Sequence, residues 1–207
     1  GAAIAPEDGL FPELAIQPRL AEAAEGVKTE ATKADVKALI ELFEEADVYG
    51  SLILVPDSLA KKLPALRGLV MANLGVADLD RQAIARELSY LVRQAEFLAA
   101  QYTVCVANPP YLGGKSLCRE LKDFLATEYA GFEKDVFSAF FLRGLEFTPR
   151  HGYLGFMSPF TWMFISTFQP LREYLIEHVA LSAWVQLEYS GFAGATVPVC
   201  TFTLRKS

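Results

Sequence analysis

The residues best suited to chemistry in this sequence are Asn108-Pro109-Pro110-Tyr111, which directly follow a short apolar run. An Asn side-chain oxygen and a proline carbonyl can both accept hydrogen bonds from an exocyclic aromatic amine. Such acceptors draw the nitrogen towards tetrahedral geometry, so that its lone pair, otherwise delocalised into the ring, becomes available for in-line attack. The ring of Tyr111 can stack on a base, a contact worth about 1–3 kcal/mol. These residue types indicate a site that activates an aromatic amine.

The same four residues also have a simpler interpretation as the turn that ends a strand, because proline fixes φ and cannot donate to a sheet. Their position favours a site, since ligands of open α/β sheets bind outside the carboxyl ends of strands. Average composition predicts this tetrapeptide by chance on the order of once per thousand chains of this length. Two successive prolines also hold their carbonyls rigidly, so little ordering entropy is lost on binding.

The elements that position this motif alternate between strands and helices in the second half of the chain. The apolar run over residues 102–107 is typical of a strand buried on both faces. Helices are predicted over 117–128, over 134–147 and from Pro170 to about residue 178, and further strands over 153–157, 181–187 and 197–204. This order predicts an α/β architecture.

The first hundred residues predict a mainly helical region without recognisable chemistry. Residues 1–30 are rich in Ala, Pro and Glu and predict an irregular lead-in. A helix is expected from Lys33, a short extended piece over 49–56 and then a charged helix. A long helix follows from about residue 80 to 100, with Ile84, Leu88, Leu91, Val92 and Ala95 as its apolar stripe. We therefore expect two regions, a helical one over 1–100 and a sheet-containing one over 101–207.

Charge and cysteine content exclude some classes of function. The formal net charge of −6 argues against a broad nonspecific nucleic-acid surface on these residues. The three cysteines, Cys105, Cys118 and Cys200, are widely spaced and form no CxxC pair, so no metal site is expected. We expect reduced, mostly buried thiols in a cytoplasmic protein.

The sequence predicts neither a signal peptide nor a membrane span. Its amino terminus has no basic stretch followed by an apolar one. Residues 152–171 carry no charge and are long enough to cross a bilayer. However, Pro159, Pro170 and several Ser and Thr residues divide this segment into a strand, a loop and the start of a helix.

A few other residues are weaker candidates for a functional role. Asp135 precedes a Phe-rich helix, where it can either interact with the helix dipole or help to order the loop after Tyr111. His151 and His178 are expected to be structural. Trp162 and Phe164 are expected to pack in the core rather than to line a base pocket.

The motif NPPY resembles the catalytic motif of amino-group DNA methyltransferases of the N6-adenine type, which use S-adenosylmethionine. Residues 135–163 resemble the helix and strand that follow this motif in such enzymes, and residues 190–206 resemble their late motif. The resemblance implies that Asn108, Pro109, Pro110 and Tyr111 are catalytic. It also implies that Tyr111 and Phe192 stack on the two faces of an adenine extruded from double-stranded DNA.

Two further stretches narrow the resemblance. The segments GSLILVPDSLAKKLPAL and QAEFLAAQYTVCVANPPYLGGK are similar to the large methyltransferases of bacterial phage-resistance (BREX, PglX-type) systems and to fused type II restriction-methylase enzymes. The resemblance is specific over residues 100–207, weaker over 50–99 and absent over the first 30. It implies a role in restriction-modification or phage defence.

One departure from the family concerns the cofactor. The family holds S-adenosylmethionine with a Gly-rich motif upstream of NPPY, whereas Gly50, Gly68 and Gly75 of this sequence are isolated. No cofactor-binding residue is therefore assigned. The chain also stops at Ser207, where the family continues into a target-recognition region. We expect the second half of a Rossmann-like methyltransferase sheet, inactive by itself.

These expectations leave an alternative and set the partners. The alternative is a non-catalytic DNA- or partner-binding scaffold derived from a methyltransferase domain. The expected partners are double-stranded DNA, reached through a longer parent protein, and components of a defence system, with no membrane. Because a bare strand edge favours aggregation, we expect the N-terminal segment or a second copy of the chain, as a homodimer, to cover the strand before Asn108.

Overall fold

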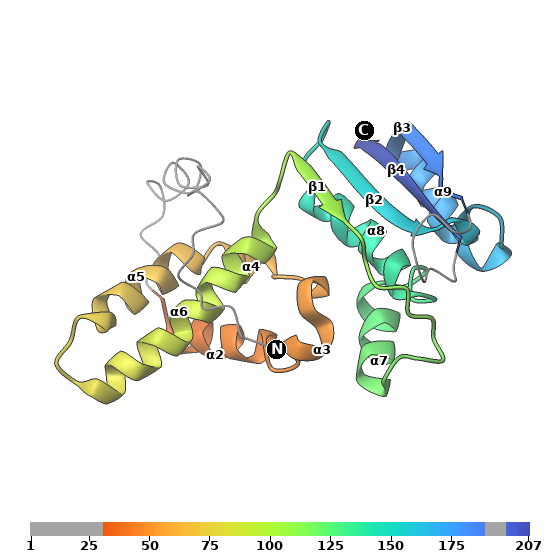
Figure 1. Ribbon diagram of the computed structural model, residues 1–207. Helices are drawn as coiled ribbons and strands as arrows, with labels where there is room; N and C mark the ends of the chain where they lie inside the picture. The colour runs from red at the N-terminus through yellow and green to blue at the C-terminus, as the bar shows by residue number, and fades with distance from the viewer. Residues whose placement is uncertain (1–30, 189–197) are drawn as a thin grey trace.

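The computed structural model describes residues 31–188 and 198–207, in which a helical region precedes a sheet with helices packed on it (Figure 1). The lead-in expected over residues 1–30 and the loop that holds Phe192 lie outside these described residues. The helical region comprises α2 (Lys33–Leu42), α3 (Ala46–Tyr49), the 3-10 turn η1 (Gly50–Leu52), α4 (Asp57–Ala60), α5 (Leu63–Leu74) and α6 (Leu79–Ala99).

The remaining elements build the sheet and its cover. The strands are β1 (Val104–Ala107), β2 (Tyr153–Pro159), β3 (Val179–Gln186) and β4 (Val199–Lys206). The helices are α7 (Arg119–Glu128), α8 (Val136–Phe147) and α9 (Gln169–His178), with 3-10 turns η2 (Phe160–Met163) and η3 (Ser166–Phe168). Within the described parts of the chain, none of the helices combines the length and apolarity needed to cross a membrane.

The helical region has an apolar cluster of its own. Leu39 of α2, Leu66 of α5 and Ala95 of α6 are at most 1% exposed and belong to this cluster. The long helix expected over about 80–100 is therefore present, as α6. Ile84 of its predicted stripe is 61% exposed, because the neighbouring Ala85 turns towards the interior instead.

The segment predicted to be extended over residues 49–56 begins differently. Gly50 adopts φ +53°, in the region that favours glycine, and opens the 3-10 turn that ends at Leu52. Residues 53–56, after this turn, belong to neither a helix nor a strand. Leu52 is 2% exposed and belongs to the core beneath the sheet rather than to the cluster of the helical region.

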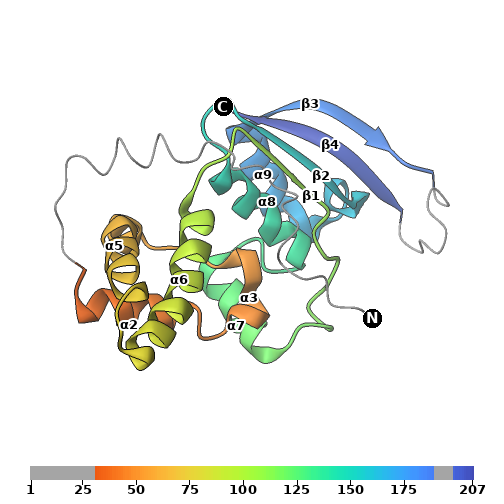
Figure 2. The same cartoon turned by 60° about the vertical axis from the view of Figure 1, so that its left-hand side comes forward.

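The four strands form a mixed sheet in the order β1-β2-β4-β3. Strand β1 pairs with β2 in parallel, with Val104 opposite Tyr153 and Ala107 opposite Phe156. Strand β4 lies antiparallel between β2 and β3. Helices α8 and α9 lie on the same face of this sheet (Figure 2). The architecture confirms the expected α/β class.

Aromatic rings fill the space between α8 and the sheet. Phe141 of α8 stacks on Phe202 of β4, with centroids 5.0 Å apart, and meets Trp162 edge-on at 5.2 Å. Phe141 is fully buried, and Phe202 is 2% exposed. Offset and edge-on ring pairs of this kind add about 0.5–1.5 kcal/mol each to the burial of their area.

Gly144 lets α8 approach β2 closely. A Cβ atom at this position would lie 2.6 Å from Cδ1 of Leu154 and 2.9 Å from Cζ of Phe156. Both neighbours are buried in the core. The absence of a side chain at residue 144 therefore sets how near the helix and the strand can lie.

The expectation that the strand before Asn108 is buried on both faces is wrong. Val104 is 57% exposed and Val106 is 76% exposed, because α8 and α9 cover only the other face. Among residues 31–188 and 198–207, β1 pairs only with β2, so it forms one edge of the sheet. Cover of this edge by the N-terminal segment or by a second copy stays a prediction.

The prediction of a core position is correct for Trp162 but wrong for Phe164 and for one of the cysteines. Trp162 is 7% exposed and donates its indole N–H to Oγ of Ser158 at 3.1 Å, as a core residue should. Phe164 is 68% exposed, because the 3-10 turn ends before it and points it outward. Of the cysteines, Cys200 is buried and Cys105 half-buried, but Cys118 is exposed at the start of α7.

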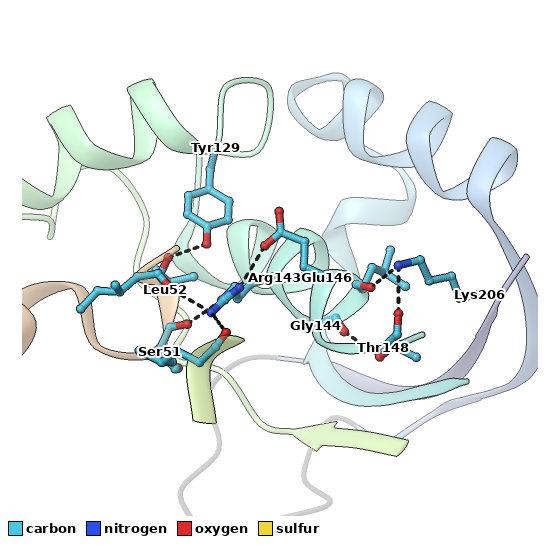
Figure 3. Close-up of polar contacts among 11 residues, drawn as sticks. Ser51, Leu52, Tyr129, Arg143, Gly144, Glu146, Thr148 and Lys206 are labelled. Atoms are coloured by element: carbon cyan, nitrogen blue, oxygen red, sulfur yellow. Dashed lines mark hydrogen bonds and ion pairs between the residues drawn. The ribbon is translucent and has the colours of Figure 1, made fainter. Parts of the chain in front are cut away.

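A buried arginine joins the helical region to the sheet region (Figure 3). The guanidinium of Arg143, on α8, donates to the carbonyl oxygens of Ser51 at 2.8 Å, Ile53 at 2.8 Å and Leu98 at 2.9 Å. Arg143 is 4% exposed, and Glu146 accepts a further bond at 3.2 Å.

A tyrosine strengthens the same joint. The Tyr129 hydroxyl donates to the carbonyl of Leu52 at 2.6 Å, and burial raises the pKa of Tyr129 so that this donor stays protonated. Because these bonds cross the boundary expected at residues 100–101, the division into two regions stays a prediction.

We expect Arg143→Met to lower the free energy of unfolding by about 2–4 kcal/mol, because buried carbonyls would lose a charged donor. Urea denaturation measures this difference. Arg67→Ala is the matched control, since Arg67 pairs with Glu96 while about half exposed. Such pairs contribute about 0–1 kcal/mol. An Arg143→Met variant as stable as the control would contradict the role of Arg143 as a joint.

Candidate active site at the carboxyl end of strand β1

The residues of the NPPY motif lie at the carboxyl edge of the sheet. Strand β1 ends at Ala107, and Asn108 begins the loop that leaves it. Asn108 and Pro110 are exposed, Pro109 is buried and Tyr111 is half-buried. The loop is thus anchored by one proline while it presents the asparagine side chain to solvent, which suits a site that must receive a ligand.

The two polar side chains of the motif meet each other. The Tyr111 hydroxyl donates to Oδ1 of Asn108 at 2.7 Å. Burial raises the pKa of Tyr111, so the hydroxyl remains a protonated donor at neutral pH. This bond fixes the side-chain amide of Asn108 with its oxygen towards the tyrosine. The oxygen has two lone pairs, so it can accept a second hydrogen bond from a ligand.

The ring of Tyr111 is supported by α8. Its centroid lies 6.3 Å from that of Phe137, and the two rings are nearly perpendicular at 88°. Phe137 is 2% exposed and belongs to the core. The edge of a buried ring therefore limits where Tyr111 can move.

Asp135 links the loop to the start of the same helix. Its Oδ1 accepts from the backbone N–H of Phe137 at 3.2 Å, as an N-cap, and from that of Leu112 at 3.1 Å. The backbone N–H of Val136 donates back to the carbonyl of Leu112 at 3.1 Å. Asp135 therefore has both of the roles that the sequence left open, since it interacts with the start of the helix and binds the loop after Tyr111. Burial raises the pKa of Asp135, and the backbone donors partly oppose this.

The histidines lie away from the motif. His151 lies two residues before the start of β2, and His178 directly precedes β3, so both lie at the amino ends of strands. His178 shares a hydrogen bond with the carbonyl of Tyr174 at 2.8 Å and stacks on its ring.

In the described part of the chain, no group of three His, Cys, Asp or Glu residues could hold a metal ion.

Some contacts of the site could not be anticipated from residue types. The role of Phe137 as the support of Tyr111, and of the Leu112 amide as a partner of Asp135, depend on how α8 meets the loop. The available signal was an aspartate placed directly before a Phe-rich helix. Phe192, expected to stack on the second face of a base, lies outside the described residues.

Comparison with known proteins decides the family. Residues 53–192 match the family model of the Eco57I restriction-modification methylase. The chain belongs to the Eco57I methylase family. The predicted resemblance to methyltransferases is thereby confirmed, as is the fold class of a partial Rossmann-like methyltransferase sheet preceded by a helical region.

The individual proteins that this chain resembles are much longer than the chain, which spans at most about a third of their length. The adenine-specific methyltransferase BrxX of Escherichia coli O9:H4 (strain HS) is 31% identical over 139 residues, which cover 67% of this chain and 12% of BrxX. The adenine-specific methyltransferase PglX of Lacticaseibacillus casei (strain Zhang) is 36% identical over 87 residues, 42% of this chain and 7% of PglX. The type II restriction enzyme and methyltransferase RM.Eco57I of Escherichia coli is 24% identical over 150 residues, 70% of this chain and 15% of that enzyme.

The raised pKa of Asp135 leads to a prediction about stability and pH. Because this pKa is higher in the folded than in the unfolded chain, the stability that the carboxyl contributes is fully present below the unfolded pKa. It is lost as pH rises through the folded pKa. Asparagine keeps an oxygen at the same place but does not ionise, so Asp135→Asn should become more stable relative to the unchanged chain as pH rises.

Urea unfolding of both chains between about pH 3 and pH 7 measures the effect, since the ordinary pKa of aspartate falls in this range. A difference in unfolding free energy that stays constant over the range would contradict the prediction.

Proposed function

We propose that this chain supplies the base-binding catalytic site of an S-adenosylmethionine-dependent DNA adenine-N6 methyltransferase that acts in restriction-modification or phage defence. The observation that carries the proposal is the bond from Tyr111 to Asn108 at the carboxyl end of β1, in a chain of the Eco57I methylase family. Two of the relatives are named adenine-specific methyltransferases, which supports adenine as the target.

In this proposal, Oδ1 of Asn108 and the carbonyl of Pro109 accept the two hydrogens of the adenine amine. Oδ1 keeps its bond to Tyr111 and uses its remaining lone pair for the amine. The nitrogen then loses conjugation with the ring, and its lone pair turns towards the methyl donor. Pro110 holds the loop rigid, because its φ is fixed.

The ring of Tyr111 stacks on one face of the adenine, and Phe192 is proposed for the other face. Within a duplex, both faces of an adenine are stacked on neighbouring bases. The adenine must therefore be extruded from double-stranded DNA before two aromatic side chains can stack on it. DNA is therefore the proposed substrate and components of a defence system the proposed partners. The bacterial cytoplasm, where DNA is found, is the proposed location.

The cofactor needs residues beyond those that hold the base. When bound, S-adenosylmethionine supplies an electrophilic methyl group. The sequence contains no Gly-rich loop before Asn108 that would hold S-adenosylmethionine, so we assign no residue of this chain to binding the cofactor. We propose that its main contacts come from residues outside 1–207, so that this chain alone transfers little or no methyl.

The central test is Asn108→Ala in a protein that joins residues 1–207 to a cofactor-binding half. Loss of one preorganised hydrogen-bonding group at a reacting centre typically lowers kcat about 10²–10³-fold. We expect a loss of that size in the transfer of labelled methyl groups to adenine-containing DNA, with unchanged unfolding. Asn73→Ala, on α5, is the matched control. Transfer by Asn108→Ala at the rate of the control would reject the proposed role.

The Tyr111 hydroxyl can be tested separately from its ring. Tyr111→Phe keeps the stacking surface but frees the amide of Asn108, so we expect kcat to fall about three- to tenfold, the equivalent of one neutral hydrogen bond. Tyr111→Ala should also weaken binding of DNA, because it removes the stacking contact. Equal kinetics of the Phe and Ala variants would contradict a stacking role.

The isolated chain gives a further test. Residues 1–207 incubated with labelled S-adenosylmethionine and adenine-containing DNA should show little or no transfer. Robust turnover would refute the proposal that the main cofactor contacts lie elsewhere. If transfer is also absent from every longer protein that contains these residues, a non-catalytic scaffold becomes the better account.

A further inference from the structure

Leu112, the residue after the motif, is held at both of its backbone polar groups. Its N–H donates to Oδ1 of Asp135 at 3.1 Å, and its carbonyl accepts from the N–H of Val136 at 3.1 Å. A β-bridge between Gly113 and Asp135 continues the pairing. The loop that leaves the motif is therefore tied to the first residues of α8, 23 positions further along the chain.

The element to which the loop is tied is among the most buried in the chain. Val136 and Phe137 are at most 3% exposed, and Ala139 and Phe141 are fully buried. A helix packed in this way has little freedom to shift. Tyr111 is thus held in three ways: its hydroxyl by Asn108, its ring by Phe137, and its following residue by the link to α8.

Helix capping alone does not account for this arrangement. Ser, Thr, Asn and Asp all serve as N-caps, and a cap needs only one oxygen near the N–H of the second or third helical residue. At residue 135 one carboxylate oxygen reaches the cap position and the N–H of Leu112 at once. A serine hydroxyl is attached one atom closer to the backbone, so it can cap the helix without reaching Leu112.

We propose that Asp135 is a positioning residue of the base site, whose side chain latches Leu112 to α8 and so fixes Asn108 and Tyr111 for catalysis. The inference rests on the proposed function, because it assigns the latch a role in methyl transfer. Asp135 itself touches neither the base nor the methyl donor in this account. It acts through the backbone of the loop.

Three variants separate the latch from the cap. Asp135→Asn keeps an oxygen for both N–H groups, Asp135→Ser keeps only the cap, and Asp135→Ala removes both. Asp78→Ser is the matched control, because Asp78 caps α6 by accepting from Asp80 and Arg81 and has no bond to the loop. Since the Ala variant can fail to fold, the comparison between Ser and Asn decides.

The first measurement is amide hydrogen exchange on residues 1–207, which needs no enzymatic activity. In Asp135→Ser we expect the Leu112 amide to exchange about tenfold faster or more, while the Phe137 amide keeps its protection. Asp135→Asn and Asp78→Ser should leave Leu112 protected. Unchanged protection of Leu112 in Asp135→Ser would overturn the latch.

The second measurement is methyl transfer by a protein that joins residues 1–207 to a cofactor-binding half. Asp135→Ser should lower kcat about tenfold with KM for S-adenosylmethionine unchanged, and Asp135→Asn should restore kcat. Unchanged kcat in a Ser variant that has lost Leu112 protection would overturn the positioning role. If the unchanged protein transfers no methyl while Leu112 is protected, the proposed function fails but the latch stands as a structural link.

Discussion

The buried guanidinium of Arg143 is the interaction on which the arrangement of the chain depends most. A charge that is 4% exposed is tolerated only when its donors are satisfied, and here three carbonyl oxygens from two distant segments accept from it. The same bonds fix the end of α6 and the turn at residues 51–53 against α8. The helical region and the sheet therefore share one polar joint rather than a purely apolar contact.

Helix α8 connects this joint to the candidate site, to the aromatic core and to the last strand. At its start, Asp135 holds the loop that carries the candidate site. In its middle, Phe141 fills the aromatic core against β4. At its end, the Lys206 ammonium donates to the carbonyls of Leu145 and Thr148 at 2.7 and 2.9 Å, which binds the last strand to the helix (Figure 3). A single element of twelve residues thus relates the site, the core and the joint.

Local pattern was sufficient to predict most of the elements and to place the candidate site at the end of a strand. Proline chemistry placed Asn108 at the end of a strand, and apolar periodicity found α6 and α8. What it could not supply was the surroundings of each element. An apolar run such as residues 102–107 does not reveal whether helices cover one face or two, and Val106 is exposed for that reason. Likewise, the residue type of Arg143 does not predict its three carbonyl partners. Every residue has a backbone carbonyl, so the pattern of side chains does not show which carbonyls lie near the guanidinium.

The lack of a side chain at Gly144 affects the candidate site through the position of α8. Glycine in the middle of a helix destabilises it by roughly 0.5–1 kcal/mol relative to alanine, and here it permits close contact with Leu154 and Phe156. An α-helix rises about 1.5 Å per residue, so Gly144 lies about 13 Å along the axis from Asp135, and packed interiors transmit strain over such distances. A larger side chain at residue 144 would push the carboxyl end of α8 away from β2. The resulting tilt of the helix would also move Asp135, at its amino end, and the loop that Asp135 binds. The position of the candidate site therefore depends partly on how closely α8 packs on β2.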